Sequence, residues 1–244
     1  MKRSTVNCII KGFEKIIKER GFALPPFCDW TPEEWQTKGH EYDEIRGNML
    51  GWDVTDYGGG DFEKVGLALI TIRNGKQNSG GTGAESPHCP AGHLPQNSDK
   101  YPKPYAEKLL LSQEGQIAPM HFHFYKMEDI INRSGGILCM QLYNSTPDGE
   151  FADTDVRVVS DGHAYNVAAG TTVRLTPGQS ITLYPGQYHK FWAEEGHGAV
   201  LIGEVSMCND DNTDNRFYEE IPRFSVIDED EPPYRLLCNE YPVA

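Results

Sequence analysis

The spacing of apolar residues divides the chain near residue 64 into a helical part and a strand-rich part. Within residues 4–20, apolar side chains recur three and four positions apart, which is typical of an amphipathic helix; they are Ile9, Ile10, Phe13, Ile16 and Ile17. The run Thr31-Pro-Glu-Glu has a capping residue, a proline at the first helical position and two early acids, and it predicts a second helix start. We expect another short helix over residues 41–49.

From residue 64 onward, short apolar runs replace the helical spacing. Residues 65–73 predict a strand that ends at Asn74-Gly75. A long polar segment follows over residues 76–104. Further strands, separated by Gly and Pro turns, are predicted at 105–112, 116–124, 136–144, 155–160, 163–167, 172–175, 180–184, 188–193 and 199–206. A helical turn is expected at 127–132, and so many short strands favour a β-sandwich or a small barrel.

We therefore expect one domain of 244 residues. Its parts would be an N-terminal helical extension (1–60), a β-barrel (64–206) and a C-terminal segment (207–244) that wraps over the barrel.

Charge and cysteine content narrow the classes of function. The net charge of −14 repels nucleic acid and anionic membranes, so we expect neither as a partner. No apolar stretch approaches the roughly 20 residues that span a bilayer. The six cysteines are scattered without a C-x-x-C pair, and the N-terminal residues lack the apolar run of a secretory leader. We expect reduced thiols and a cytoplasmic location.

Three metal-binding side chains lie within eight positions: His121, His123 and Glu128. Residues two apart in a strand point to the same face, so both imidazoles can reach one ion. Glu128 follows after a short run that can turn back toward it. His189, far downstream, is a fourth candidate ligand. This mixed nitrogen and oxygen set suits Mn²⁺, Fe²⁺, Co²⁺, Ni²⁺ or Zn²⁺. A second cluster, His88-Cys89 with His93, is a weaker candidate because adjacent side chains in an extended segment point apart.

The stretch from Gly115 to Gly135 is similar to the first cupin motif, G-x5-H-x-H-x3,4-E-x6-G, at every spacing. The second cupin motif is matched only in part, because Pro185 adjoins Gly186 and Ala193 stands where the motif has Asn. These departures affect turn geometry and leave the ligand His189 in place. The resemblance implies a mainly β cupin fold, a double-stranded β-helix or jelly-roll barrel, here with N-terminal helices.

More of the chain resembles the D-lyxose isomerase family of cupin sugar isomerases. The similarity covers roughly residues 5–241 and is carried by the run from His121 to Gly136, by Glu107-Lys108, by the Asp- and Asn-rich tract at 209–217 and by the ending at 236–241. It implies a metal-dependent aldose–ketose isomerase that interconverts D-lyxose with D-xylulose and D-mannose with D-fructose. It also implies Mn²⁺ as the usual metal and a homodimer. The family's metal ligands correspond to His121, His123, Glu128 and His189.

Aldose–ketose isomerisation proceeds either by proton transfer through a cis-enediol or by a metal-assisted hydride shift. For the proton route we assign the base to Glu204, because it lies on an apolar strand where a carboxylate needs a partner. The alternative is a solvent-facing Glu204. Lys108, also on an apolar strand, is expected to polarise or protonate a sugar oxygen unless it faces solvent. Arg216 is expected to bind distal sugar hydroxyls, or else to form a salt bridge with Asp210, Asp211 or Asp214.

Three other functions are compatible with a cupin metal site. A cupin dioxygenase would use Fe²⁺ or Ni²⁺ with the same ligands. A sugar-phosphate isomerase would need clustered basic residues, which the sequence lacks near the motifs. A sugar-binding protein without catalysis commonly lacks some of the ligands, whereas all four are present here.

Overall fold

The fold is described from a computed structural model that covers residues 1–78, 96–97 and 100–244. The weaker metal candidate, His88-Cys89 with His93, lies outside the described residues. Within the described part of the chain, no helix combines the length and the apolar character needed to cross a membrane.

The N-terminal part is helical, as the apolar spacing predicts. Its elements are the α-helices α1 (Arg3–Glu19), α2 (Pro32–Trp35) and α3 (Asp43–Gly47) and the 3-10 helices η1 (Pro26–Asp29) and η2 (His40–Tyr42). The predicted start at Thr31 is confirmed. The side chain of Thr31 accepts a hydrogen bond from the Glu34 amide, and the Glu34 carboxylate accepts one from the Thr31 amide.

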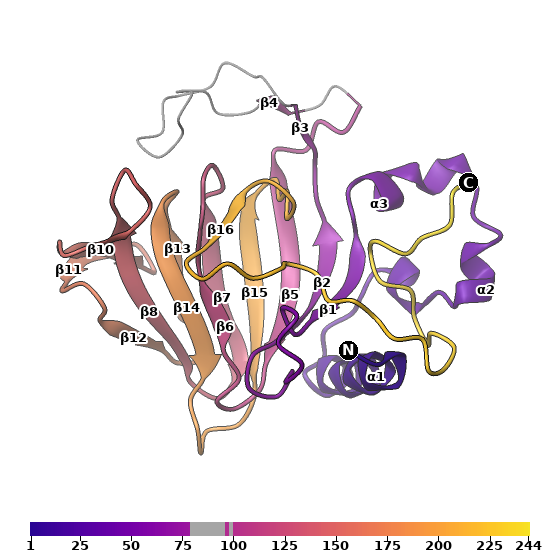
Figure 1. The fold of residues 1–244 in the computed structure, drawn as a ribbon, viewed down its shortest axis with the longest axis horizontal. Coiled ribbons are helices and arrows are strands. Elements are labelled where there is room, and N and C mark those ends of the chain that lie inside the picture. The colour runs from indigo at the N-terminus through magenta and orange to yellow at the C-terminus, as the bar shows by residue number, and fades with distance from the viewer. Residues whose placement is uncertain (79–95, 98–99) are drawn as a thin grey trace.

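Two antiparallel sheets follow and face each other (Figure 1). The larger sheet contains, in spatial order, β1 (Gly51–Thr55), β2 (Leu67–Arg73), β5 (Tyr105–Ser112), β15 (Val200–Met207), β7 (Glu128–Gly135), β13 (Ser180–Leu183), β10 (Val156–Ser160) and β11 (His163–Val167). The smaller contains β12 (Thr172–Leu175), β8 (Leu138–Ser145), β14 (Gln187–Ala193), β6 (Ala118–His123) and β16 (Asn215–Phe217), with β9 (Phe151–Ala152) paired to β8. A small ribbon joins β3 (Gln77–Asn78) and β4 (Gln96–Asn97).

The prediction of a helical turn at residues 127–132 is wrong. Strand β7 begins at Glu128 and is paired on both edges, with β13 on one side and β15 on the other. Its burial alternates along the strand, with Glu128, Ile130 and Asn132 buried. Pairing with two flanking strands sets a period of two along this segment, which replaces the turn that was expected after the two histidines.

Two hydrophobic cores hold these layers together. The inner faces of the two sheets enclose one core, which includes Ile130, Leu142, Leu183 and Phe191. The outer face of the larger sheet forms the second core with α1, where Phe13 packs edge-on against Trp52 at 5.8 Å between ring centroids. The predicted mainly β architecture with N-terminal helices is confirmed.

The C-terminal segment connects the barrel with the helices. Strand β16 pairs with β6, and the chain then runs toward α1 and α2 (Figure 1). There the amide of Cys238 donates to the Trp52 carbonyl at 2.7 Å, and Tyr241 stacks on Trp35 at 3.9 Å. The buried guanidinium of Arg3 binds the carboxylates of Glu229 and Glu240, both near the end of the chain. The division into three parts stays a prediction.

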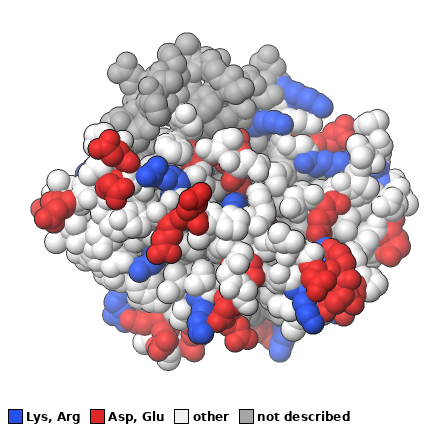
Figure 2. Space-filling model, in the orientation of Figure 1, with Lys and Arg blue, Asp and Glu red and all other residues white. Residues whose placement is uncertain are grey.

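Charged side chains are spread over the molecular face drawn in Figure 2. Asp and Glu lie there among Lys and Arg without one dominant basic patch. On the face drawn, this distribution gives no favourable surface for a polyanion.

We predict that Arg3→Ala weakens the attachment of the C-terminal segment. It removes a buried, charge-assisted bond network to two carboxylates, and we expect a loss of about 2–3 kcal/mol in the free energy of unfolding. Urea unfolding measures this loss of stability. Lys15→Ala removes an exposed pair with Glu19 at 3.8 Å and is the control, with an expected change below about 0.5 kcal/mol. Equal stability of the two variants would contradict the prediction.

Candidate metal centre and active site

Three imidazoles converge inside the barrel from two neighbouring strands. His121 and His123 lie two apart on β6, so they share its inner face, and His189 of β14 is the antiparallel partner of His121. The ligand nitrogens of the three side chains all lie within 4.8 Å of one another. The predicted convergence of β6 with the distant His189 is thus present in the fold.

Backbone carbonyls fix the orientation of two of these rings. Nδ1 of His121 lies 2.8 Å from the carbonyl oxygen of Pro119, and Nδ1 of His189 lies 3.0 Å from that of Gln187. Because a carbonyl can only accept, each Nδ1 carries the proton and each Nε2 is left as a donor to a metal. Burial and the nearby imidazoles of His189 and His123 hold the pKa of His121 well below its ordinary value. The ring is therefore neutral, as a metal ligand must be.

Glu128 lies at the start of β7, directly beside the imidazoles. Its Oε1 is 3.4 Å from Nε2 of His123 and 3.2 Å from Nε2 of His189, and its Oε2 is 2.7 Å from Nζ of Lys126. Burial alone would raise the pKa of Glu128, but Lys126 and His123 outweigh it and hold this pKa well below its usual range. Three imidazole nitrogens and an ionised carboxylate meet at one buried point, and this donor set fits a divalent ion of the Mn²⁺ to Zn²⁺ series.

Lys126 connects the metal ligands with Glu204. Its Nζ lies 2.8 Å from Oε1 of Glu204, which also accepts a hydrogen bond from Oγ of Ser206 at 2.9 Å. Burial by itself lowers the pKa of Lys126, but the carboxylates of Glu128 and Glu204 reverse this effect and raise the pKa above its ordinary value. The ammonium group is therefore charged and bridges the two carboxylates.

A second cation reaches Glu204 from the neighbouring strand. Nζ of Lys108 on β5 lies 3.7 Å from Glu204 Oε1 and 3.8 Å from Oδ1 of Asp211. Asp211 in turn pairs with Arg223 at 3.0 Å, and Arg223 pairs with Asp53 at 2.6 Å. Burial opposes ionisation of Asp211, but Arg223 and Lys108 hold its pKa far below the ordinary value. The pocket wall is thus a continuous chain of paired charges.

The Asp- and Asn-rich tract shapes the turn that carries Lys126. The buried carboxylate of Asp214 accepts backbone hydrogen bonds from Tyr125 at 2.8 Å and from Lys126 at 3.1 Å, and its carbonyl accepts one from Phe124. The turn between β6 and β7 is therefore anchored to β16 at its start. This anchoring determines where Lys126 and Glu128 enter the pocket.

The structure brings six of the seven predicted site residues to one pocket: Lys108, His121, His123, Glu128, His189 and Glu204. Lys108 and Glu204 are buried and point inward, so the solvent-facing alternative is wrong for both. Apolar side chains complete the lining, including Leu69, Ile130 and the aromatic rings of Tyr57, Phe191 and Phe217. The individual roles of these residues stay predictions.

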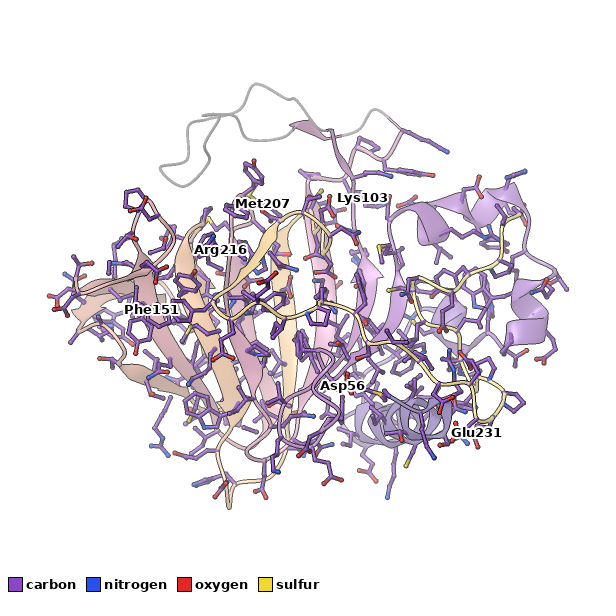
Figure 3. All side chains as sticks on the ribbon, viewed as in Figure 1. Asp56, Lys103, Phe151, Met207, Arg216 and Glu231 are labelled. Atoms are coloured by element: carbon purple, nitrogen blue, oxygen red, sulfur yellow. The ribbon has the colours of Figure 1, made fainter. Side chains whose placement is uncertain are left out.

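Arg216, the seventh, does not reach the pocket. Its neighbours on β16, Asn215 and Phe217, line the pocket, and strand alternation directs Arg216 to the other face, as labelled in Figure 3. Its guanidinium instead donates to the hydroxyl of Tyr188 at 3.2 Å and to the carbonyl of Gly149 at 3.4 Å. None of the described contacts of Arg216 is with Asp210, Asp211 or Asp214. The salt bridge that was the alternative prediction is therefore absent among the described residues as well.

Sequence reasoning missed Lys126, Asp211 and Arg223 as pocket residues. Lys126 lies inside the first motif, between His123 and Glu128, and this position was its only signal. Asp211 and Arg223 lie outside the predicted barrel and reach the pocket through tertiary contacts that no local spacing reveals.

Comparison with solved structures supports the same architecture. The L-ribose isomerase of Acinetobacter sp. DL28 in complex with L-ribose aligns over 93% of this chain and 98% of its own, with a TM-score of 0.60 and 12% identity. The L-ribose isomerase of Cellulomonas parahominis with L-ribose also aligns over 93% of this chain and 98% of its own, with a TM-score of 0.57 and 13% identity. At these identities the likeness concerns the fold. A barrel of two facing sheets that encloses a three-histidine group is typical of cupin proteins. The predicted cupin fold is confirmed.

Sequence comparison identifies the family. The family model described as D-lyxose isomerase matches residues 1–241. Two proteins named D-lyxose/D-mannose isomerase are similar over 242 residues, 99% of this chain and 98% of each relative: 43% identical in Escherichia coli O157:H7 and 45% identical in Serratia proteamaculans. The chain belongs to the D-lyxose isomerase family.

We predict that His189→Ala lowers the affinity for Mn²⁺ by at least about 100-fold, because loss of a direct ligand exceeds the loss expected for an outer partner. Competition with a fluorescent chelator measures the affinity. His163→Ala, in the exposed strand β11, is the control and leaves it unchanged. Equal Mn²⁺ affinity in His189→Ala and wild type would show that the imidazoles do not hold the ion.

Proposed function

We propose that this protein is a Mn²⁺-dependent aldose–ketose isomerase that converts D-lyxose to D-xylulose and D-mannose to D-fructose through a cis-enediol. The two relatives, similar over nearly their whole length, carry both aldoses in their names. The observation that carries the proposal is the direct link from the candidate metal ligand Glu128 through Lys126 to the candidate base Glu204, all in one pocket.

The donor set formed by His121, His123, Glu128 and His189 would hold the ion. When bound, a divalent ion supplies a Lewis acid for the sugar carbonyl and the adjacent hydroxyl. The single negative charge of Glu128 would offset only one of the two positive charges of the ion, and Mn²⁺, which accepts both nitrogen and oxygen ligands, suits this set.

Glu204 is assigned to move the proton between C2 and C1. The base removes the C2 proton of the aldose while O1 gains a proton, which gives the enediol. The base then returns its proton to C1 while O2 loses one, which gives the ketose, so no net proton is consumed. The described contacts of Glu204 with Lys126, Lys108 and Ser206 are all to Oε1. These donors orient the carboxylate, so Oε2 is the oxygen that we assign to proton transfer.

Lys108 and Arg223 are assigned to bind sugar oxygens. Lys108 lies beside Glu204, where an ammonium can donate to the oxygen that gains a proton in the enediol. Arg223 is held by Asp53 and Asp211 on the same wall, farther along the chain of charges, and is placed to donate to more distant hydroxyls. Arg223 thus takes the role that the sequence suggested for Arg216.

The charge of the pocket favours a free sugar over a sugar phosphate. The three cations Lys108, Lys126 and Arg223 face the four carboxylates Asp53, Glu128, Glu204 and Asp211, and each cation is already paired. A phosphate group needs uncompensated cations or a cluster of amides. The paired wall suits neutral hydroxyls, which can insert between charged partners.

We further propose a cytoplasmic homodimer that binds neither nucleic acid nor membranes. The family resemblance supports the dimer. The five cysteines in the described residues form no disulfide with one another, and four of them are buried, which suits a reducing compartment. The net charge of −14 disfavours polyanionic partners.

An aldose panel tests the function. Metal-stripped protein is restored in turn with Mn²⁺, Co²⁺, Ni²⁺, Zn²⁺ or Fe²⁺ and given D-lyxose or D-mannose without oxygen. We expect D-xylulose and D-fructose, with Mn²⁺ most effective, because isomerisation needs no co-substrate. D-Mannose 6-phosphate serves as the comparison and is converted more slowly. If both free sugars stay unchanged while oxygen is consumed with another substrate, the protein is a cupin oxygenase instead.

Glu204→Gln tests the base. The amide cannot accept the C2 proton, so we expect kcat to fall by about 10² to 10⁴. Mn²⁺ affinity should be retained, because Glu204 lies outside the donor set. Glu195→Gln, on an exposed turn, is the matched control and keeps wild-type kinetics. Isomerisation by Glu204→Gln at close to the wild-type rate would remove Glu204 from this role.

A further inference from the structure

A second polar hollow adjoins the metal pocket at the end of β15, near Met207 and Lys103 in Figure 3. Its volume is about 250 Å³, against about 40 Å³ for the free space of the metal pocket. The hollow has room for a much larger ligand.

One residue lines both spaces. Asp211 contributes to the wall of the metal pocket and to that of the hollow. Its carboxylate is held by Arg223 at 3.0 Å and lies 3.8 Å from Lys108. A ligand in the hollow therefore lies behind the same ion pairs that we assign to sugar binding.

Asparagine amides cross-link the three segments that form the hollow. Nδ2 of Asn48 donates to the carbonyl of Asn74 at 3.0 Å, and Nδ2 of Asn74 donates to the carbonyls of Asn48 and Asn209. The amide of Asn209 completes the set by donating to Oδ1 of Asn74 at 2.9 Å. These bonds hold the wall rigid and fix which atoms face inward.

Asn48 keeps one acceptor without a partner. Its side chain is 4% exposed, and its Oδ1 has no hydrogen bond among the described residues. This acceptor is also closed to solvent, so it lies inside the wall and does not contact a ligand in the hollow. The next residue, Met49, has a φ of 53°, a left-handed conformation that is uncommon for a non-glycine residue. Such conformations cluster at ligand sites.

The chemistry of the lining selects a polyhydroxylated ligand. The wall includes Thr71, Lys76, Asp210, Asp211 and Asn212, which offer hydroxyl, ammonium, carboxylate and amide groups. Both signs of charge are present, so the lining selects neither an anion nor a cation, and its polarity disfavours an apolar ligand. Hydroxyls both donate and accept, as these groups require.

We propose that the hollow is an antechamber that binds the sugar before it enters the metal pocket, with Asp211 as the shared wall. The inference rests on the proposed function. The sugar first forms hydrogen bonds with the exposed polar side chains of the hollow, Lys76, Asp210 and Asn212. It then reaches the metal pocket as Asp211, Arg223 and Lys108 exchange their mutual contacts for contacts with sugar oxygens.

Filling the hollow tests the proposal. Asn212 lies at its exposed rim, and the one described contact of its side chain is 3.9 Å to Sδ of Met49, so Asn212→Trp blocks the space without removing a buried bond. We expect affinity for D-arabinitol, the alditol of D-lyxose, to fall about tenfold by calorimetry, and KM for D-lyxose to rise about tenfold, more than any change in kcat. Asn166→Trp, on the exposed strand β11, is the matched control.

The outcomes separate this inference from the proposed function. Thermal unfolding first verifies that each variant is folded. If Asn212→Trp leaves both D-arabinitol affinity and KM within about twofold of wild type, the antechamber is overturned while the isomerase stands. If wild type converts no aldose but binds D-arabinitol, and Asn212→Trp weakens that binding, the proposed isomerase fails and the antechamber stands. Absence of D-arabinitol binding to wild type also overturns the antechamber.

Discussion

The arrangement of the pocket depends on one buried ammonium group. Nζ of Lys126 lies 2.7 Å from Glu128 and 2.8 Å from Glu204, and all three side chains are almost fully buried. Two carboxylates in a low-dielectric interior repel each other and lose hydration, and a shared cation offsets both costs. Lys126 supplies that cation. It makes a metal-binding carboxylate compatible with a proton-transferring carboxylate in the same small space.

The fold supplies what this bridge needs. Glu204 on β15 and Glu128 on β7 come from adjacent strands, where Ser206 is paired in register with Glu128. Asp214 fixes the turn that carries Lys126 by accepting two of its backbone hydrogen bonds. Lys108, Asp211, Arg223 and Asp53 continue the alternation of charge toward the polar hollow. Metal binding, proton transfer and sugar recognition are therefore parts of one network of neutralised charges.

Much of this was predictable from sequence because it depends on local spacing. The His121 and His123 pair, the strand alternation that turns Glu204 inward and the apolar stripe of α1 each follow from a period of two or 3.6. Residues 127–132 were misassigned because their pairing with two strands distant in sequence is a tertiary contact that local spacing does not reveal. Arg216 and Arg223 were not distinguishable, since which guanidinium reaches the pocket depends on the face of β16 and on the path of the C-terminal segment.

The central claim is that a protein carboxylate, held by Lys126 next to the metal ligands, transfers a proton between the two sugar carbons. The most direct measurement is isomerisation of D-lyxose in D₂O by the Mn²⁺-loaded protein, followed by NMR. Proton transfer by an exchanging carboxyl group predicts deuterium at C1 of the D-xylulose that forms, and at C2 of the D-lyxose that is re-formed from it. Full conversion with no deuterium at either carbon would contradict the account and indicate a direct hydride shift.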